Sequence, residues 1–172
     1  NADNLLHFPD FRAFERSYQL MSQVAGRAGR KGKRGKVMIQ TYNPEHRIIK
    51  QIVDQQFEGM VNYELIERKA LHYPPYYRLI HLSVRHRDQH DAERAARMLS
   101  VELKKLLGKR LLGPETPSIA RIRNYYHQNM MIKLEHGISL DLVKSQLAKV
   151  LAEFRADKKH QSVRIVVNVD PQ

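Results

Sequence analysis

The chain has 172 residues, of which 42% are hydrophobic and none is cysteine. This length accommodates one large domain or two small ones with a packed core, which excludes a disordered chain, and the lack of cysteine excludes disulfides and thiolate-held metal ions. Lys and Arg number 30 against 18 Asp and Glu, a net charge of +12, so the expected partners are polyanions: nucleic acid, acidic protein tails or anionic membrane. No apolar run approaches the roughly 20 residues of a membrane span, so no membrane-embedded role is expected.

The N-terminal segment combines a predicted helix with a basic, glycine-rich stretch. Asp10 is placed to cap a helix over 11–25, because apolar residues recur there at helical spacing: Phe11, Phe14, Tyr18, Met21 and Val24. Residues 26–36 read GRAGRKGKRGK, with four glycines and no acid, which predicts a loop in the second half. A strand is predicted over 37–42.

Two further helices are predicted over 45–55 and 57–72. The sequence then reads Tyr-Pro-Pro-Tyr-Tyr at 73–77, and two consecutive prolines cannot continue a helix. We therefore predict a domain boundary here. The expected organisation is a first segment over 1–42, a helical connector over 43–75 and a C-terminal domain over 76–172.

The C-terminal domain alternates strands and helices in a regular order. The predicted elements are a strand over 77–85, a helix over 88–107, strands over 119–123 and 129–135, a helix over 139–156 and a strand over 163–169. Ile80, Leu82 and Val84 fall on one face of the first strand. The order β-α-β-β-α-β is typical of the ferredoxin-like fold. The expected class is therefore α/β in the α+β sense, with both helices on one face of a four-stranded sheet and the other face free.

The segment QVAGRAGR, residues 23–30, places one glutamine and two arginines at a fixed spacing with small residues between them. Arginine is always charged and forks onto phosphate oxygens, and small residues let a ligand approach the backbone. An arginine so placed could stabilise charge that develops during phosphoryl transfer. The alternative interpretation is a solvated basic loop after a helix.

A second group of candidate residues lies on the predicted sheet. Arg121 and Arg123 are two apart on one predicted strand and would share a face. Lys133 and Arg164 could reach the same surface from neighbouring strands, with Tyr125 and Tyr126 at the turn. Basic residues beside aromatic rings suit single-stranded nucleic acid, whereas acidic partner tails would use the same charges. The alternative is an ordinary solvated sheet face.

Metal and nucleophile chemistry have little support. His81, His86 and His90 lie around a strand end and a helix start, without a carboxylate at a diagnostic spacing, so no metal site is expected. No Gly-x-Ser-x-Gly elbow is present either.

Residues 23–30 resemble motif VI of superfamily 2 helicases. The surrounding blocks PDFRAFERSYQLMSQVAGRAGR, GKVMIQTYNPEH, ELIERKALHYPPYYRL, LLGPETP and the closing NVDP resemble, in order, the C-terminal end of the PriA family of primosomal replication-restart helicases. The resemblance runs over the whole chain. It implies an ATP-dependent 3′-5′ DNA helicase that recognises stalled or abandoned forks and restarts replication by primosome assembly. It also implies a bacterial, cytoplasmic, nucleoid-associated protein.

The resemblance also implies roles for individual residues. Asp3, Asp10 and Arg12 correspond to motif V, while Gln23, Arg27 and Arg30 correspond to motif VI, with both arginines as arginine-finger candidates toward ATP. Segment 1–42 would be the end of the second RecA-like helicase lobe, and 37–42 its last strand. The domain over 76–172 would bind DNA, forked or single-stranded, and the C-terminal tail of SSB, alongside other primosome proteins.

The chain departs from the family pattern in what it lacks. It contains no Walker A sequence GxxxxGK[ST], no Walker B sequence and none of the zinc-binding cysteines of the family. ATP with Mg²⁺, and zinc, are therefore expected in the parent protein only, and this chain by itself is expected to be inactive and to hold no cofactor. The alternative function is a stand-alone basic module that binds RNA or ribosomes, against which the residues of motif VI argue.

Overall fold

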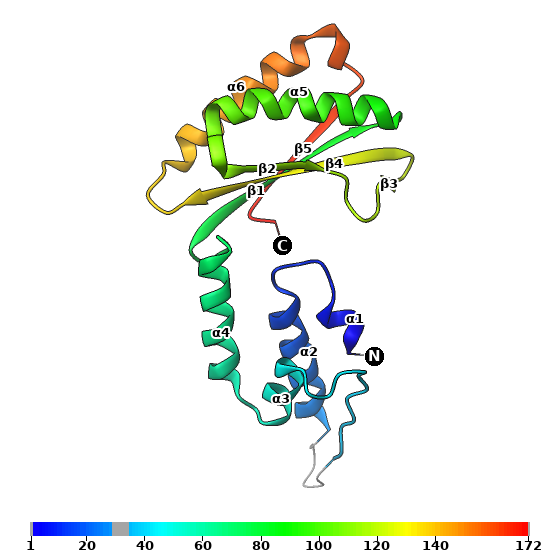
Figure 1. The fold of residues 1–172 in the computed structure, drawn as a ribbon, viewed down its shortest axis with the longest axis vertical. Helices are drawn as coiled ribbons and strands as arrows, with labels where there is room; N and C mark the ends of the chain where they lie inside the picture. The colour runs from blue at the N-terminus through cyan, green and yellow to red at the C-terminus, as the bar shows by residue number, and fades with distance from the viewer. Residues whose placement is uncertain (1, 29–34, 172) are drawn as a thin grey trace. The chain divides into compact units, whose positions relative to one another are not determined.

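The computed structural model describes residues 2–28 and 35–171. The chain divides into two compact units, Asn1–Leu71 and His72–Gln172 (Figure 1). Most of the predicted connector over 43–75 therefore belongs to the first unit. None of the helices in the described ranges combines the length and the apolar content that a membrane crossing requires.

The first unit is helical. Its elements are α1 (Asp3–Leu6), α2 (Ala13–Arg27), α3 (Arg47–Val53) and α4 (Phe57–Ala70), so the two helices predicted after residue 44 are confirmed. The helices pack around a small apolar core of buried residues: Ala2, Leu6, Tyr18, Met21, Ile48, Ile49, Ile52 and Met60. This core gives α2 its inward face, because Tyr18 and Met21 are spaced for one side of a helix.

Two predictions for this unit were wrong in detail. Asp10 does not cap α2: its carboxylate accepts a hydrogen bond from the Arg12 backbone N–H (2.9 Å), which makes a turn, and the helix begins only at Ala13. Residues 37–42 are not a strand, since a strand needs a paired ladder and no strand occurs in the described part of this unit. Instead the Ala2 backbone N–H donates to the Gln40 carbonyl (2.9 Å).

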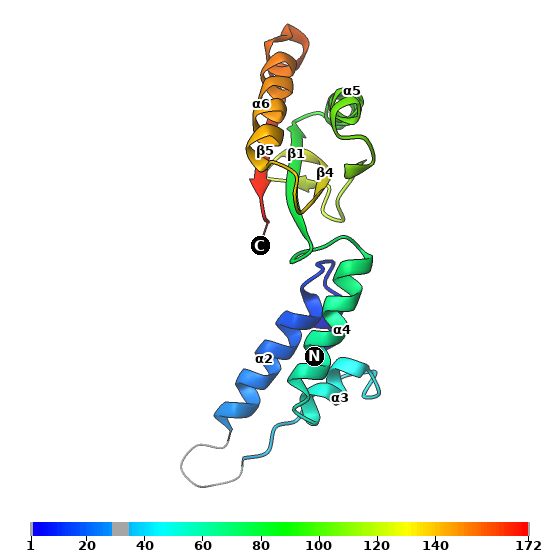
Figure 2. The same cartoon turned by 90° about the vertical axis from the view of Figure 1, so that its left-hand side faces the viewer.

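The second unit is an antiparallel sheet with two helices on one face (Figure 1), and Figure 2 shows the same helices after a quarter turn. Its elements are β1 (Tyr77–His86), α5 (Gln89–Leu107), η2 (Gly108–Arg110), β2 (Leu111–Glu115), β3 (Arg121–Ile122), β4 (Tyr125–Glu135), α6 (Leu140–Ala156), η3 (Lys158–His160) and β5 (Arg164–Val169). The strand order is β2-β4-β1-β5, with β3 paired to β4. Because β4 lies between β1 and β2, and β1 between β4 and β5, both halves are split βαβ units. The predicted α+β class is confirmed.

Helix caps and strand alternation explain why this unit folds as the sequence predicts. The carboxylate of Asp88 accepts from the Asp91 backbone N–H (3.0 Å) and the Ser139 hydroxyl from Leu142 (3.4 Å), so each begins its helix. The predicted inward residues of β1 are fully buried against α5 and α6: Ile80, Leu82 and Val84.

One strand was predicted in the wrong place. The second strand of the ferredoxin-like order is β2, at 111–115, whereas the segment predicted as a strand over 119–123 contributes only the two residues of β3. Gly113-Pro114 is typical of a turn, but β2 pairs with β4 on both sides of an irregularity in register between Leu112 and Glu115. A bulge at the sheet edge accommodates residues that a regular strand excludes.

Gly113 is required by this irregular edge. Its φ is +88°, and a Cβ here would lie 2.7 Å from the Asn129 carbonyl oxygen. We expect Gly113→Ala to lower the free energy of unfolding of the second unit by about 2 kcal/mol. Gly137→Ala is the matched control, since its φ is also positive (+102°) but no atom lies within 4 Å. Equal losses in chemical denaturation would contradict a steric role for the Asn129 carbonyl.

Candidate nucleic-acid interface

One end of the sheet in the second unit gathers arginines around a tyrosine. Tyr125 begins β4, and the guanidinium carbons of Arg164 and Arg87 lie 4.8 and 5.9 Å from its ring centroid. Both separations allow cation–π attraction, which is worth about 0.5–1 kcal/mol at exposed sites. The ring therefore keeps two guanidinium groups at the same place.

Arg85 lies on the same face as this group. In the sheet register it is opposite Arg164 on β5 and opposite His127 on β4, and opposed residues point to the same side. The neighbouring pair Val84 and Ile165 is buried against the helices. Because alternate residues face opposite sides, the Arg85 row lies on the face without helices.

This end of the sheet is positively charged and not neutralised. Within residues 2–28 and 35–171, no carboxylate is within ion-pair distance of Arg85, Arg87 or Arg164. The sequence from Thr116 to Leu134 contains no acidic residue. The arginines thus form a basic surface that is free to bind an anion.

A series of buried polar side chains holds Arg85 in place. Its Nε donates to the Ser83 hydroxyl (3.2 Å), whose oxygen lies 3.3 Å from Nδ1 of His127. Ser83 and His127 are buried. Burial, followed by the charge of Arg85, lowers the pKa of His127, and the same two causes lower the pKa of His81. Both imidazoles are therefore neutral at pH 7, so the two arginines, Arg85 and Arg164, carry the charge of this row.

This geometry predicts a pH dependence. Since the pKa of His127 is lowered below its ordinary value of 6.5 in the folded state, proton uptake favours the unfolded state, and stability is lost as pH falls below about 6.5. We expect His127→Gln to lose less stability than the wild type between pH 7.5 and 5.5 in thermal unfolding. Parallel pH profiles would contradict a destabilising proton on His127.

The structure does not bring the predicted sheet residues onto one face. Arg123 lies in the turn between β3 and β4, with φ of +47°, and so does not share a strand face with Arg121. Arg121 is opposite Tyr126, with its guanidinium 5.3 Å from that ring. Because Tyr126 pairs with His86, this pair lies on the helix side of the sheet, away from Tyr125.

Lys133 is on the same face as Arg164 but at the other end of β4. Lys133 is eight positions after Tyr125, about 26 Å along a strand. Its ammonium lies 3.7 Å from the Tyr73 ring centroid, and burial lowers its pKa. Lys133 lines a separate groove of about 650 Å³, together with residues that include Lys105, Leu106, Lys109, Arg110 and Leu112.

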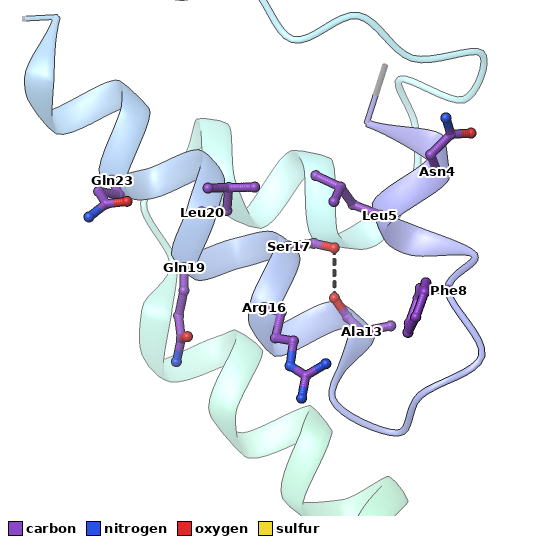
Figure 3. A pocket seen from close by; sticks show the side chains of 9 residues that line it. All are labelled: Asn4, Leu5, Phe8, Ala13, Arg16, Ser17, Gln19, Leu20 and Gln23. Atoms are coloured by element: carbon purple, nitrogen blue, oxygen red, sulfur yellow. Dashed lines mark hydrogen bonds between the residues drawn. The ribbon is translucent and has the colours of Figure 1, made fainter. Parts of the chain in front are cut away.

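In the first unit, the residues of motif VI that the structure describes lie on one side of α2. Gln23 and Arg27 are four residues apart, hence neighbours on the helix surface, and both are exposed. Gln23 also lines an open groove of about 630 Å³, whose apolar wall is formed by Leu5, Phe8 and Leu20 (Figure 3). Arg30 lies outside the described residues.

The residues predicted as motif V make structural contacts within the first unit. The Asp3 carboxylate accepts hydrogen bonds from the Thr41 hydroxyl (2.6 Å) and the Tyr42 backbone N–H (3.0 Å), so it ties α1 to the segment after the glycine-rich stretch. Asp10 forms an ion pair with Arg16 (2.7 Å), and the Arg12 guanidinium lies 4.9 Å from the Phe11 ring.

Sequence reasoning missed Arg85 and Arg87. The position of Arg85 could have been predicted, because Arg85 alternates with the inward residues Ile80, Leu82 and Val84 on the correctly predicted first strand and so lies on the free face. Arg87 lies beyond that strand. The predicted basic face rested instead on Arg121 and Arg123, whose predicted strand over 119–123 contributes only Arg121–Ile122 to the sheet.

One group in the described ranges could hold a metal ion: His86, Asp88 and Asp91, whose ligand atoms lie within 4.8 Å of one another. These groups already have partners. Asp88 caps α5, and Nδ1 of His86 accepts from the Asp88 backbone N–H (3.0 Å). The positive end of the α5 dipole also opposes a cation here, so the expectation of no metal site stays a prediction.

Comparisons with known proteins agree with the sequence blocks. Residues 69–172 match the family described as primosomal protein N C-terminal domain. Proteins named replication restart protein PriA are similar over 99% of the chain: 35% identical in Bacillus subtilis, 34% in Synechocystis and 37% in Treponema pallidum. The chain covers 21%, 20% and 25% of these relatives, respectively, and so spans about a fifth to a quarter of their length.

Proposed function

Because the chain belongs to the primosomal protein N C-terminal domain family, we propose that it is part of a replication-restart helicase and that its second unit binds DNA at stalled forks. The observation that carries the proposal is the pair of Arg87 and Arg164 at the Tyr125 ring, with Arg85 opposite Arg164 in the sheet. Among the described residues no carboxylate lies within ion-pair distance of these three arginines. Phosphates supply the charge that this surface lacks.

The parent protein would be an ATP-dependent 3′-5′ helicase of the bacterial cytoplasm and nucleoid. In it, the first unit would complete the second helicase lobe. The exposed side of α2 with Gln23 and Arg27 supports a contact with nucleotide phosphates, in which these side chains would orient and neutralise the phosphate charge. The residues present do not form a complete site for Mg-ATP, because the chain has no P-loop, and they do not fit zinc, because it has no cysteine. We expect phosphate release from ATP to stay at the buffer background for this chain alone, with or without DNA.

Besides DNA, the proposed partners are SSB and other primosome proteins. The groove beside Lys133 is our proposed site for the acidic C-terminal tail of SSB. It combines Lys105 and Lys109 with the apolar side chains of Leu106 and Leu112. Cations and an apolar wall together suit an acidic peptide that ends in a hydrophobic residue. Binding of such a peptide that is unchanged in Lys109→Gln would argue against this groove.

Fluorescence anisotropy across a salt series tests the proposed DNA binding. Labelled single-stranded DNA, a forked DNA and a double-stranded RNA are titrated with the whole chain. We expect both DNAs to bind and the logarithm of the affinity to fall linearly with the logarithm of salt. Absence of DNA binding at low salt would contradict the proposal, and a clear preference for the RNA would favour the stand-alone RNA-binding module instead.

A further inference from the structure

We propose that Arg85 and Arg164 form a two-arginine clamp for one phosphodiester group of single-stranded nucleic acid, and that Tyr125 positions Arg164 in this clamp. The proposal deepens the DNA-binding function proposed above and rests on it. The clamp lies on the helix-free face, at the end of the sheet beside β3 (Figure 1).

The first argument is the pairing of like charges. Arg85 and Arg164 are directly opposite each other on antiparallel strands, an arrangement that destabilises a sheet when nothing lies between the charges. The third member of the row, His127, is kept neutral by burial and by Arg85 itself, so it does not add to the repulsion. An anion bound between the two guanidinium groups would remove the repulsion.

The second argument is that both guanidinium groups are held in place before any ligand binds. Nε of Arg85 donates a hydrogen bond to the buried hydroxyl of Ser83 (3.2 Å). The terminal N–H groups of Arg85 can then donate to two phosphate oxygens. Arg164 is held by the Tyr125 ring at 4.8 Å. Ordering these side chains in advance reduces the entropy that binding would otherwise cost.

The third argument concerns the kind of anion. The clamp lies beside the turn between β3 and β4, where Arg123 is exposed, and no acidic residue occurs from 116 to 134. A strip of cations beside aromatic rings fits a chain with regularly spaced phosphates and flat bases. A short acidic peptide would use the charges but not the rings, so we assign the clamp to nucleic acid.

The test is anisotropy of labelled oligo(dT) with the whole chain and five variants. We expect Arg85→Gln and Arg164→Gln each to weaken binding about tenfold, in line with the loss of one charge-assisted contact, and to reduce the salt slope by about one phosphate contact. Lys149→Gln, on the exposed surface of α6, removes the same charge and should leave affinity within about twofold. Tyr125→Leu should weaken binding like the arginine variants, whereas Tyr125→Phe, which keeps the ring, should bind as the wild type does.

A second readout does not depend on DNA. If the two arginines repel each other, Arg164→Gln should raise the melting temperature at low salt, and inorganic phosphate at constant ionic strength should stabilise the wild type more than Arg164→Gln. A lower melting temperature in this variant would contradict the repulsion.

The outcomes separate the two proposals. If the wild type binds oligo(dT) but the arginine variants behave like Lys149→Gln, the clamp is wrong while the DNA-binding function stands. If the wild type does not bind DNA, both are wrong. If poly-glutamate competes with oligo(dT) as well as unlabelled oligo(dT) does at equal charge, the phosphodiester assignment is overturned in favour of an acidic protein ligand.

Discussion

Leu103→Ala is expected to lower the free energy of unfolding of the second unit by about 2–5 kcal/mol, the range for a buried leucine that leaves a cavity. Leu103 lies on α5, is fully buried, and belongs to the same core cluster as Ile80 of β1 and Ile132 of β4. A cavity here therefore loosens the contact between the helix and the middle of the sheet. Hydrogen exchange of β1 and β4 amides measures the loss, because core amides exchange only when the whole unit opens.

Met98→Ala is the matched control for this substitution. Met98 lies on the same helix, and its side chain is 44% exposed, so truncation removes a similar volume without a closed cavity. We expect a change of no more than about 1 kcal/mol. Equal losses for Leu103→Ala and Met98→Ala would mean that α5 does not pack on the sheet as described.

The second large effect is expected at Arg68 in the first unit. Its guanidinium lies 2.8 Å from a carboxylate oxygen of Glu15 and 3.9 Å from one of Glu64, and Glu64 is buried. Removing one partner of a buried ion pair is strongly destabilising, because the other charge stays buried. Arg47, 3.6 Å from Glu64, remains as its second partner in the variant. We expect Arg68→Leu to lower the free energy of unfolding of the first unit by about 3 kcal/mol, measured by chemical denaturation.

The pH profile shows whether Glu64 is the cause. Burial already raises the pKa of Glu64, and the charge of Arg68 opposes this rise. Without Arg68 the pKa rises further, so the stability of the variant should be lost as pH increases through that value and partly regained toward pH 4.5. The double variant Arg68→Leu/Glu64→Leu should recover most of the loss at pH 7.5. A loss that is independent of pH, and not recovered in the double variant, would contradict this explanation.

The sequence predicted those parts of the fold whose signals are local. Asp88 and Ser139 cap α5 and α6, and the alternation of β1 placed Ile80, Leu82 and Val84 in the core, so the order of strands and helices could be read almost completely. The strand at 111–115 was missed because Gly113-Pro114 is typical of a turn, whereas pairing with β4 tolerates it as a bulge. The prediction of a strand over 37–42 was wrong because a strand also needs a partner strand to pair with, which the residue pattern of the segment does not supply.

The candidate interface was predicted only in outline. Basic and aromatic residues at one end of the free sheet face were expected, and Arg164 and Tyr125 do meet there. Which residues meet depends on the register of the strands. In the structure, Arg121 and Tyr126 lie on the other side of the sheet and Arg123 lies in a turn, unlike in the predicted strand. Arg85 pairs with Arg164 of β5, 79 positions later in the sequence, and a single sequence does not reveal this pairing.

Hydrogen–deuterium exchange of the whole chain, with and without saturating single-stranded DNA, tests the central claim most directly. If this end of the helix-free sheet face binds DNA, exchange should slow in three segments that are distant in sequence: residues 85–87 at and just after the end of β1, the β3–β4 hairpin over 121–127 and the start of β5 at Arg164. The exposed sides of α5 and α6 should be unaffected. Protection confined to those helices or to the first unit, with DNA bound, would contradict the account.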